Sequence, residues 1–67
     1  MSGYRDAIVR QAARTALAKE EAVQQDKPRG EIDALDREAG RYIARARDLG
    51  VSRQELLDAV EDIRSGN

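Results

Sequence analysis

The stretch that decides how the chain folds lies at residues 46–57, which read ARDLGVSRQELL. Gly50 is the residue type that most readily adopts the left-handed backbone conformation that ends a helix. Ser52 is a strong N-cap, and Glu55 follows it by three positions, so the two form a capping-box signature. Val51, just before the cap, is placed to form a hydrophobic staple with the leucine at the fourth helical position. One helix is therefore predicted to end just before the glycine, and another to begin just after the serine.

The segment before this turn carries the most regular hydrophobic pattern in the chain. We expect a helix near 31–49, along which apolar and small residues recur at alternating spacings of three and four, as in a coiled-coil seam. Gly40 costs about 1 kcal/mol relative to alanine inside a helix, so it either permits a close backbone contact or is merely tolerated. The seam is the predicted oligomer interface, and its residues are Ile32, Leu35, Ala39, Tyr42, Ala46 and Leu49.

Two further helices are expected, near 4–26 and 53–64, with a Lys-Pro-Arg-Gly break at 27–30. Strand signals are nearly absent, because the strong helix formers Ala, Arg, Glu, Leu and Gln dominate the chain. The first helix has an alanine-rich face interrupted by Glu20, so we expect it to gain the least from burial. The prediction is a single all-α domain over 1–67, a small helical bundle of two long helices and one short helix.

The composition predicts that this bundle is completed by a second chain. Of 27 hydrophobic residues eleven are alanine, and without Met1 and the two tyrosines only 13 large aliphatic ones remain. A single core in so short a chain rarely supplies more than about 3–5 kcal/mol. The chain has no Cys and no His, so disulfides and the common zinc sites do not contribute. We therefore expect a homodimer, or a higher homo-oligomer, built on the seam.

The residue inventory speaks against an enzyme. A cysteine nucleophile and a Ser–His triad are excluded without Cys and His, and no glycine-rich phosphate loop occurs in the sequence. We expect no metal and no cofactor. A net charge of −1 disfavours nonspecific nucleic-acid binding. No apolar run reaches the length of a membrane span, and no signal peptide is recognisable, so a cytoplasmic protein is expected.

Three arginines form a basic column on the middle helix. Arg37, Arg41 and Arg45 recur at every fourth position, so they lie on one helix face. They are the candidate partner-binding residues, as a docking face for an acidic protein or a nucleic acid. The alternative is a solvated face neutralised by acidic residues of the same helix, because such exposed pairs are common and weak.

The favoured function is a small noncatalytic protein–protein interaction module that acts as a regulator, adaptor or inhibitor through a helical face. The alternative is a small dimeric DNA-binding transcription regulator, because residues 42–60 fit a helix-turn-helix template. Arg45 stands where that template usually has an apolar residue. The helix that would read DNA carries Glu55, Asp58 and Glu61, which a phosphate backbone repels.

Residues 46–57 also resemble the short helical tail of YtrA-type GntR transcription regulators. In that tail the pattern A-R-x-L-G-x-S-x-x-E-L joins two helices behind a winged-helix domain, and the similarity extends over about residues 39–64. The resemblance implies a helical dimerisation module. It carries over no DNA-reading or ligand-binding residue, because no winged-helix domain is recognisable among these 67 residues.

Overall fold

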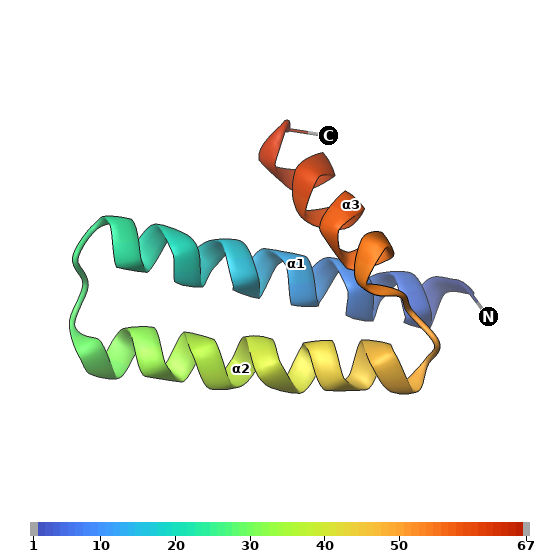
Figure 1. The fold of residues 1–67 in the computed structure, drawn as a ribbon, viewed down its shortest axis with the longest axis horizontal. Helices are drawn as coiled ribbons and strands as arrows, with labels where there is room; N and C mark the ends of the chain where they lie inside the picture. The colour runs from blue at the N-terminus through green and yellow to red at the C-terminus, as the bar shows by residue number, and fades with distance from the viewer. Residues whose placement is uncertain (1, 67) are drawn as a thin grey trace.

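The computed structural model describes residues 2–66 and contains three helices: α1 (Ser2–Gln24), α2 (Arg29–Asp48) and α3 (Arg53–Arg64). The helices α1 and α2 run side by side in opposite directions, and α3 turns back from the end of α2 across α1 (Figure 1). The structure confirms the all-α class and the predicted small bundle of two long helices and one short helix.

The first helix ends two residues earlier than predicted, at Gln24. The reason is Asp26, which adopts the left-handed conformation with φ 57°. The N–H of Lys27 then donates to the carbonyl of Ala22 at 3.0 Å, which is the helix-closing bond of a Schellman motif. An aspartate therefore occupies the position that glycine usually takes at a helix end.

The second helix begins two residues earlier than predicted, at Arg29. Pro28 precedes it with φ −54° and ψ 144°, and its carbonyl accepts the N–H groups of Glu31 and Ile32 at 3.0 and 3.2 Å. Gly30 thus lies inside the first turn of α2 rather than in the break. A proline cannot donate a hydrogen bond, and just before a helix no such bond is required.

The turn between α2 and α3 forms as predicted. Gly50 has φ 83°, and its N–H donates to the carbonyl of Arg47 at 3.0 Å. The N–H of Val51 donates to the carbonyl of Ala46 at 3.0 Å, which completes the Schellman pair of bonds. The side chains of Val51, Ala46 and Val9 meet in the hydrophobic cluster of the core, so the turn fixes the end of α2 onto α1.

The N-terminus of α3 is capped as the sequence predicts. The Ser52 hydroxyl accepts the N–H of Glu55 at 3.1 Å, and Leu56 packs against the cluster that contains Val51, as the staple predicts. No residue of α3 is fully buried. The helix therefore starts at a well-defined place but rests on α1 through a thin apolar contact.

The first helix is the centre of the bundle, contrary to the expectation that it would gain the least from burial. Both α2 and α3 pack on α1, and within residues 2–66 they do not pack on one another. Alanine is small enough to let two helix backbones approach closely, so an alanine-rich face buries well between helices. The buried residues are Val9, Ala12, Ala13, Thr15 and Ala22 of α1, Ala39 and Ala46 of α2, and Val51.

Candidate protein-interaction groove

The two alanines of the predicted oligomer seam are buried within the chain. Ala39 and Ala46 are 5% and 0% exposed, so a second copy reaches them only if the helix that covers them moves. The other four seam residues are less covered: Ile32, Leu35 and Tyr42 are half-buried and Leu49 is exposed. Ala39 and Ala46 are therefore covered within the chain, in which α2 packs on α1, and the oligomer interface stays a prediction.

Gly40 on α2 has open space around it. A Cβ atom built on Gly40 meets no other atom within 4 Å, so no close backbone contact requires a glycine there. The sequence left two interpretations open, a close backbone contact or a glycine that the helix merely tolerates, and the structure favours the second.

The basic column is exposed and forms no ion pair within residues 2–66. Arg37, Arg41 and Arg45 are all exposed, and none of them takes part in the ion pairs formed within residues 2–66. Arg41 and Arg45 line a shallow hollow between α1 and α2 together with Tyr4 and Tyr42. The column is thus a basic surface with aromatic neighbours and little concave shape.

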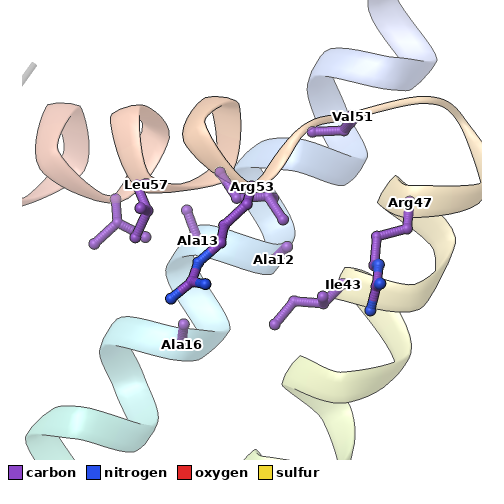
Figure 2. Close-up of a pocket in the computed structure, with 10 residues that line it drawn as sticks. Ala12, Ala13, Ala16, Ile43, Arg47, Val51, Arg53 and Leu57 are labelled. Atoms are coloured by element: carbon purple, nitrogen blue, oxygen red, sulfur yellow. The ribbon is translucent and has the colours of Figure 1, made fainter.

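An apolar groove opens where α3 diverges from the pair formed by α1 and α2, and we call it the α3 groove (Figure 2). Its volume is about 550 Å³. At Ala16 and Ile43 it continues into a second hollow, which follows α1 and α2 as far as Val23. Its apolar lining consists of Ala12, Ala13, Ala16, Ile43, Val51, Leu56, Leu57 and Val60.

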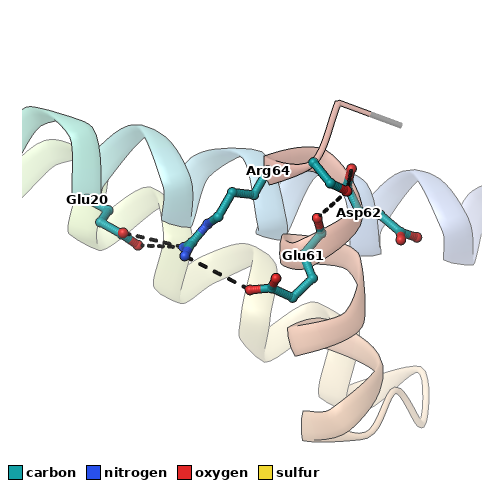
Figure 3. Close-up of polar contacts among 5 residues, drawn as sticks. Glu20, Glu61, Asp62 and Arg64 are labelled. Atoms are coloured by element: carbon teal, nitrogen blue, oxygen red, sulfur yellow. Dashed lines mark hydrogen bonds and ion pairs between the residues drawn. The ribbon is translucent and has the colours of Figure 1, made fainter.

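The charged side chains that line the second hollow are already paired. Lys19 Nζ lies 2.6 Å from Asp36 Oδ1, which ties α1 to α2, and this hydrogen bond lowers the pKa of Asp36. Arg64 at the end of α3 binds Glu20 of α1 at 3.2 Å and lies 4.0 Å from Glu61 (Figure 3). Glu20 and Asp36, the carboxylates that line the second hollow, therefore each have a cationic partner in the same chain.

Two guanidinium groups in the groove have no such partner. Arg47 and Arg53 line it from the end of α2 and the start of α3. In Figure 2 the Arg53 side chain reaches from α3 toward Ala16 of α1, and the Arg47 side chain runs beside Ile43 along α2. Within the described residues neither side chain forms an ion pair or a hydrogen bond. The groove thus combines an apolar floor with two cations whose counter-charge is not supplied by the chain.

The outer wall of the groove is held by ion pairs at both ends of α3. Arg5 of α1 binds Glu55 through both carboxylate oxygens, with Nη2–Oε1 at 2.8 Å. These hydrogen bonds lower the pKa of Glu55, and the backbone of Ser52 contributes a smaller lowering. At the other end the Arg64–Glu20 pair holds α3 to α1. Since both pairs are partly exposed, each contributes modestly to stability.

Sequence reasoning identified the basic column but not the groove. Its alanines and leucines have the same periodic spacing as core residues, so the sequence does not distinguish a side chain that faces the core from one that faces an opening. In the sequence, the groove is marked only by an arginine, Arg53, one helical turn before a leucine, Leu57. The structure shows that this leucine is 48% exposed.

No protein-family model, curated protein or solved structure matches this chain. The likeness of residues 46–57 to the tail of GntR-type regulators stays a prediction. None of the described helices is long and apolar enough to cross a membrane. Within residues 2–66, no group of His, Cys, Asp or Glu side chains is arranged to hold a metal ion.

Proposed function

We propose that this chain is a noncatalytic protein–protein interaction module, a regulator, adaptor or inhibitor that binds its partner through the α3 groove. The observation that carries the proposal is the open apolar lining of the groove, where Leu57 remains 48% exposed. Binding sites in proteins are typically concave and lined mainly by apolar side chains. Its place between helices is where ligand and partner sites are commonly built in bundles.

The chemistry of the lining supports protein binding. Arginine, which stands at the edge of the groove as Arg47 and Arg53, is among the residue types that dominate protein–protein affinity. The lining offers no Ser–His or Cys–His pair, and its charged members other than Arg47 and Arg53 are already ion-paired. The groove is therefore suited to holding another molecule by contact and charge rather than to transforming it.

A second candidate is the dimeric DNA-binding regulator, which the unpaired basic column favours, because a phosphate backbone complements exposed arginines. Two features of the structure favour the first candidate. Helices α2 and α3 do not pack on one another within residues 2–66, although the motif requires a supported recognition helix. Asp58, Glu61 and Asp62 of α3 are exposed and would repel phosphates.

Homodimerisation remains part of the proposal. The half-buried residues Ile32, Leu35 and Tyr42 and the exposed Leu49 leave apolar surface at the edge of the hairpin. Light scattering at tens of micromolar tests it directly: a folded particle of 7.4 kDa removes the homodimer from the account, and a particle of twice that mass supports it.

The test of the function compares two exposed leucines. Leu57 lines the groove and is 48% exposed, whereas Leu49 is 37% exposed and does not line it. A partner captured from the native lysate is purified, and its affinity is measured for the wild type, Leu57→Ser and Leu49→Ser. We expect Leu57→Ser to weaken partner binding about tenfold or more, which corresponds to about 1.4 kcal/mol. Leu49→Ser, at a residue of the predicted dimer seam, should keep the partner affinity of the wild type even where it weakens dimerisation.

Two outcomes contradict the proposal. Equal affinity of the three proteins would show that the partner docks elsewhere. A mobility shift with bulk DNA that weakens steeply with salt, without a protein partner, would favour the DNA-binding candidate.

A further inference from the structure

We propose that the occupant of the α3 groove is an amphipathic helix of a partner protein, with carboxylates along one flank that pair with Arg47 and Arg53. This inference rests on the proposed function, in which the groove binds a protein. It adds the secondary structure, the polarity and the charge of the bound segment.

The shape of the groove fits a helix. The lining along α1 runs from Ala12 to Val23, which is about 16 Å at 1.5 Å per residue, or three helical turns. Its floor is made of alanines, and Gly40 lies at the edge of the second hollow with free space beside it. Small side chains let a partner backbone approach closely, so a helix with apolar residues at spacings of three and four would fill the groove.

The position of the groove between α2 and α3 also favours a helix as the occupant. Both α2 and α3 pack on α1 while remaining apart from one another. A fourth helix laid along α1 between them would contact Ile43 of α2 on one side and Leu57 and Val60 of α3 on the other. Such a helix would complete a bundle that this chain alone leaves open.

The charge of the occupant follows from the two unpaired guanidinium groups. Every carboxylate that lines the groove, Glu20 and Asp36, is already bound to a cation of this chain. Arg47 and Arg53 are the cations left without a counter-charge among the lining residues. Arginine binds carboxylates in a planar, two-pronged geometry, and complementary charge sets orientation and raises the rate of association. The acidic flank of the partner helix is therefore expected to lie toward the end of the groove near the α2–α3 turn.

The experiment selects the occupant without assuming its sequence. A displayed library of helix-forming peptides, each long enough for four turns, is panned on the wild-type chain and depleted on Leu57→Ser. The affinities of enriched peptides are then measured for the double variant Arg47→Gln/Arg53→Gln. The matched control is Arg41→Gln/Arg45→Gln, which removes two unpaired arginines outside the groove.

The inference predicts enriched peptides that are amphipathic and net acidic. Their binding should weaken at least about tenfold in the groove double variant, or about 1.4 kcal/mol, and remain at the wild-type level in the control. Raising the salt concentration should reduce the difference in peptide affinity between the wild type and the groove double variant, since exposed charges are screened.

Several results would overturn the inference, and they separate it from the proposed function. Neutral or basic peptides that still require Leu57 would leave the groove as a protein site but remove the acidic helix. Equal losses in both double variants would show a general charge effect. Self-association of the chain that is lost in Leu57→Ser would make a second copy the occupant. If no peptide is enriched, the inference fails, whereas the lysate-derived partner still tests the function.

Discussion

The contact between α1 and α2 and the contact between α1 and α3 are built differently. The first is lined by alanines that are almost completely buried, such as Ala12 and Ala39, at 1% and 5% exposure. The second has no fully buried residue on α3. It depends on Leu56 at the turn and on two partly exposed ion pairs.

The difference shows how a very small chain combines a buried core with an open apolar groove. The pair of long helices buries most of the core, so it forms a firm wall for the α3 groove. The short helix forms the other wall and is held by contacts of modest strength, which places it among the elements that open locally at low cost. A wall of this kind is able to adjust to an occupant while the rest of the chain stays folded.

The largest expected effect is an overpacked contact between the long helices. Ala46→Leu places three extra carbons at a site that is 0% exposed. Overpacking costs about 1–3 kcal/mol, which is a large share of the about 3–5 kcal/mol expected of so small a core. Urea unfolding followed by circular dichroism should show a much lower midpoint. Ala44→Leu, at an exposed position of the same helix, should change it little, and equal effects would contradict the described packing.

A smaller effect is expected at the start of α3. Ser52→Ala removes the hydroxyl that accepts the Glu55 N–H, which costs about 0.5–2 kcal/mol for an N-cap. Ser52→Thr keeps an acceptor and should lose only a small part of that. Hydrogen exchange should show the α3 amides opening more often in Ser52→Ala while the α1 and α2 amides change less. An unchanged melting midpoint would mean that α3 does not begin at this cap.

The ion pairs that hold α3 predict a dependence on pH. The pKa of Glu55 is lowered below its ordinary value of 4.5, chiefly by the hydrogen bonds from Arg5. A lowered folded-state pKa gives stability that is present above the unfolded pKa and lost as pH falls through the folded one. The loss should therefore begin just below 4.5 and continue through more acid solutions.

The variants Glu55→Gln and Asp36→Asn separate the two contacts in that acid range. Asp36 also has a lowered pKa, through Lys19, but it joins α1 to α2. In Glu55→Gln the protection of the α3 amides against exchange should no longer fall as the solution becomes more acid. In Asp36→Asn this acid-dependent loss of protection should persist. The same acid response of α3 in both variants would show that the Arg5–Glu55 pair does not hold this helix.

The smallest effect on folding is expected at the basic column. Arg41 and Arg45 form no ion pair within the described residues, so reversing both to Glu removes no internal contact of that kind. Helicity should remain that of the wild type, and the melting midpoint should fall only slightly, because Arg45 lies in the last turn of α2, where an acidic side chain opposes the helix dipole. Lost dimerisation would show that the column pairs between chains, and lost partner binding would add it to the docking surface.

The parts of this fold that were predictable from sequence are those set by neighbouring residues. The Gly50 turn, the Ser52 cap and the Val51–Leu56 staple depend on chemistry within a few positions, and each is present. The central place of α1 was missed because alanines such as Ala22 occur on both buried and exposed helix faces. An alanine-rich pattern therefore does not indicate which face packs against other helices. The Arg5–Glu55 pair joins residues fifty positions apart, so no local pattern indicates it.

The candidate site was predictable to a lesser degree. The shared helix face of the basic column followed from its spacing, and the structure adds that its arginines are exposed and form no ion pair within residues 2–66. The groove depends on the angle at which α3 leaves the turn, which is set by contacts distant in sequence, such as Arg64 with Glu20. The predicted seam was recognised as an apolar stripe, but its pattern did not reveal that Ala39 and Ala46 are buried within the chain while the other four seam residues are not.

The most direct test of the central claim is to fill the groove from inside. Ala16 is partly exposed and lines both hollows, so Ala16→Phe places a ring where the partner helix is proposed to lie. Ala18→Phe, at an exposed position of the same helix, is the matched control. The affinity of the captured partner is measured for both, together with the melting midpoint. The account predicts that Ala16→Phe loses partner binding while its midpoint is unchanged or raised, and that Ala18→Phe keeps both. A folded Ala16→Phe variant that binds the partner as tightly as the wild type would contradict the account.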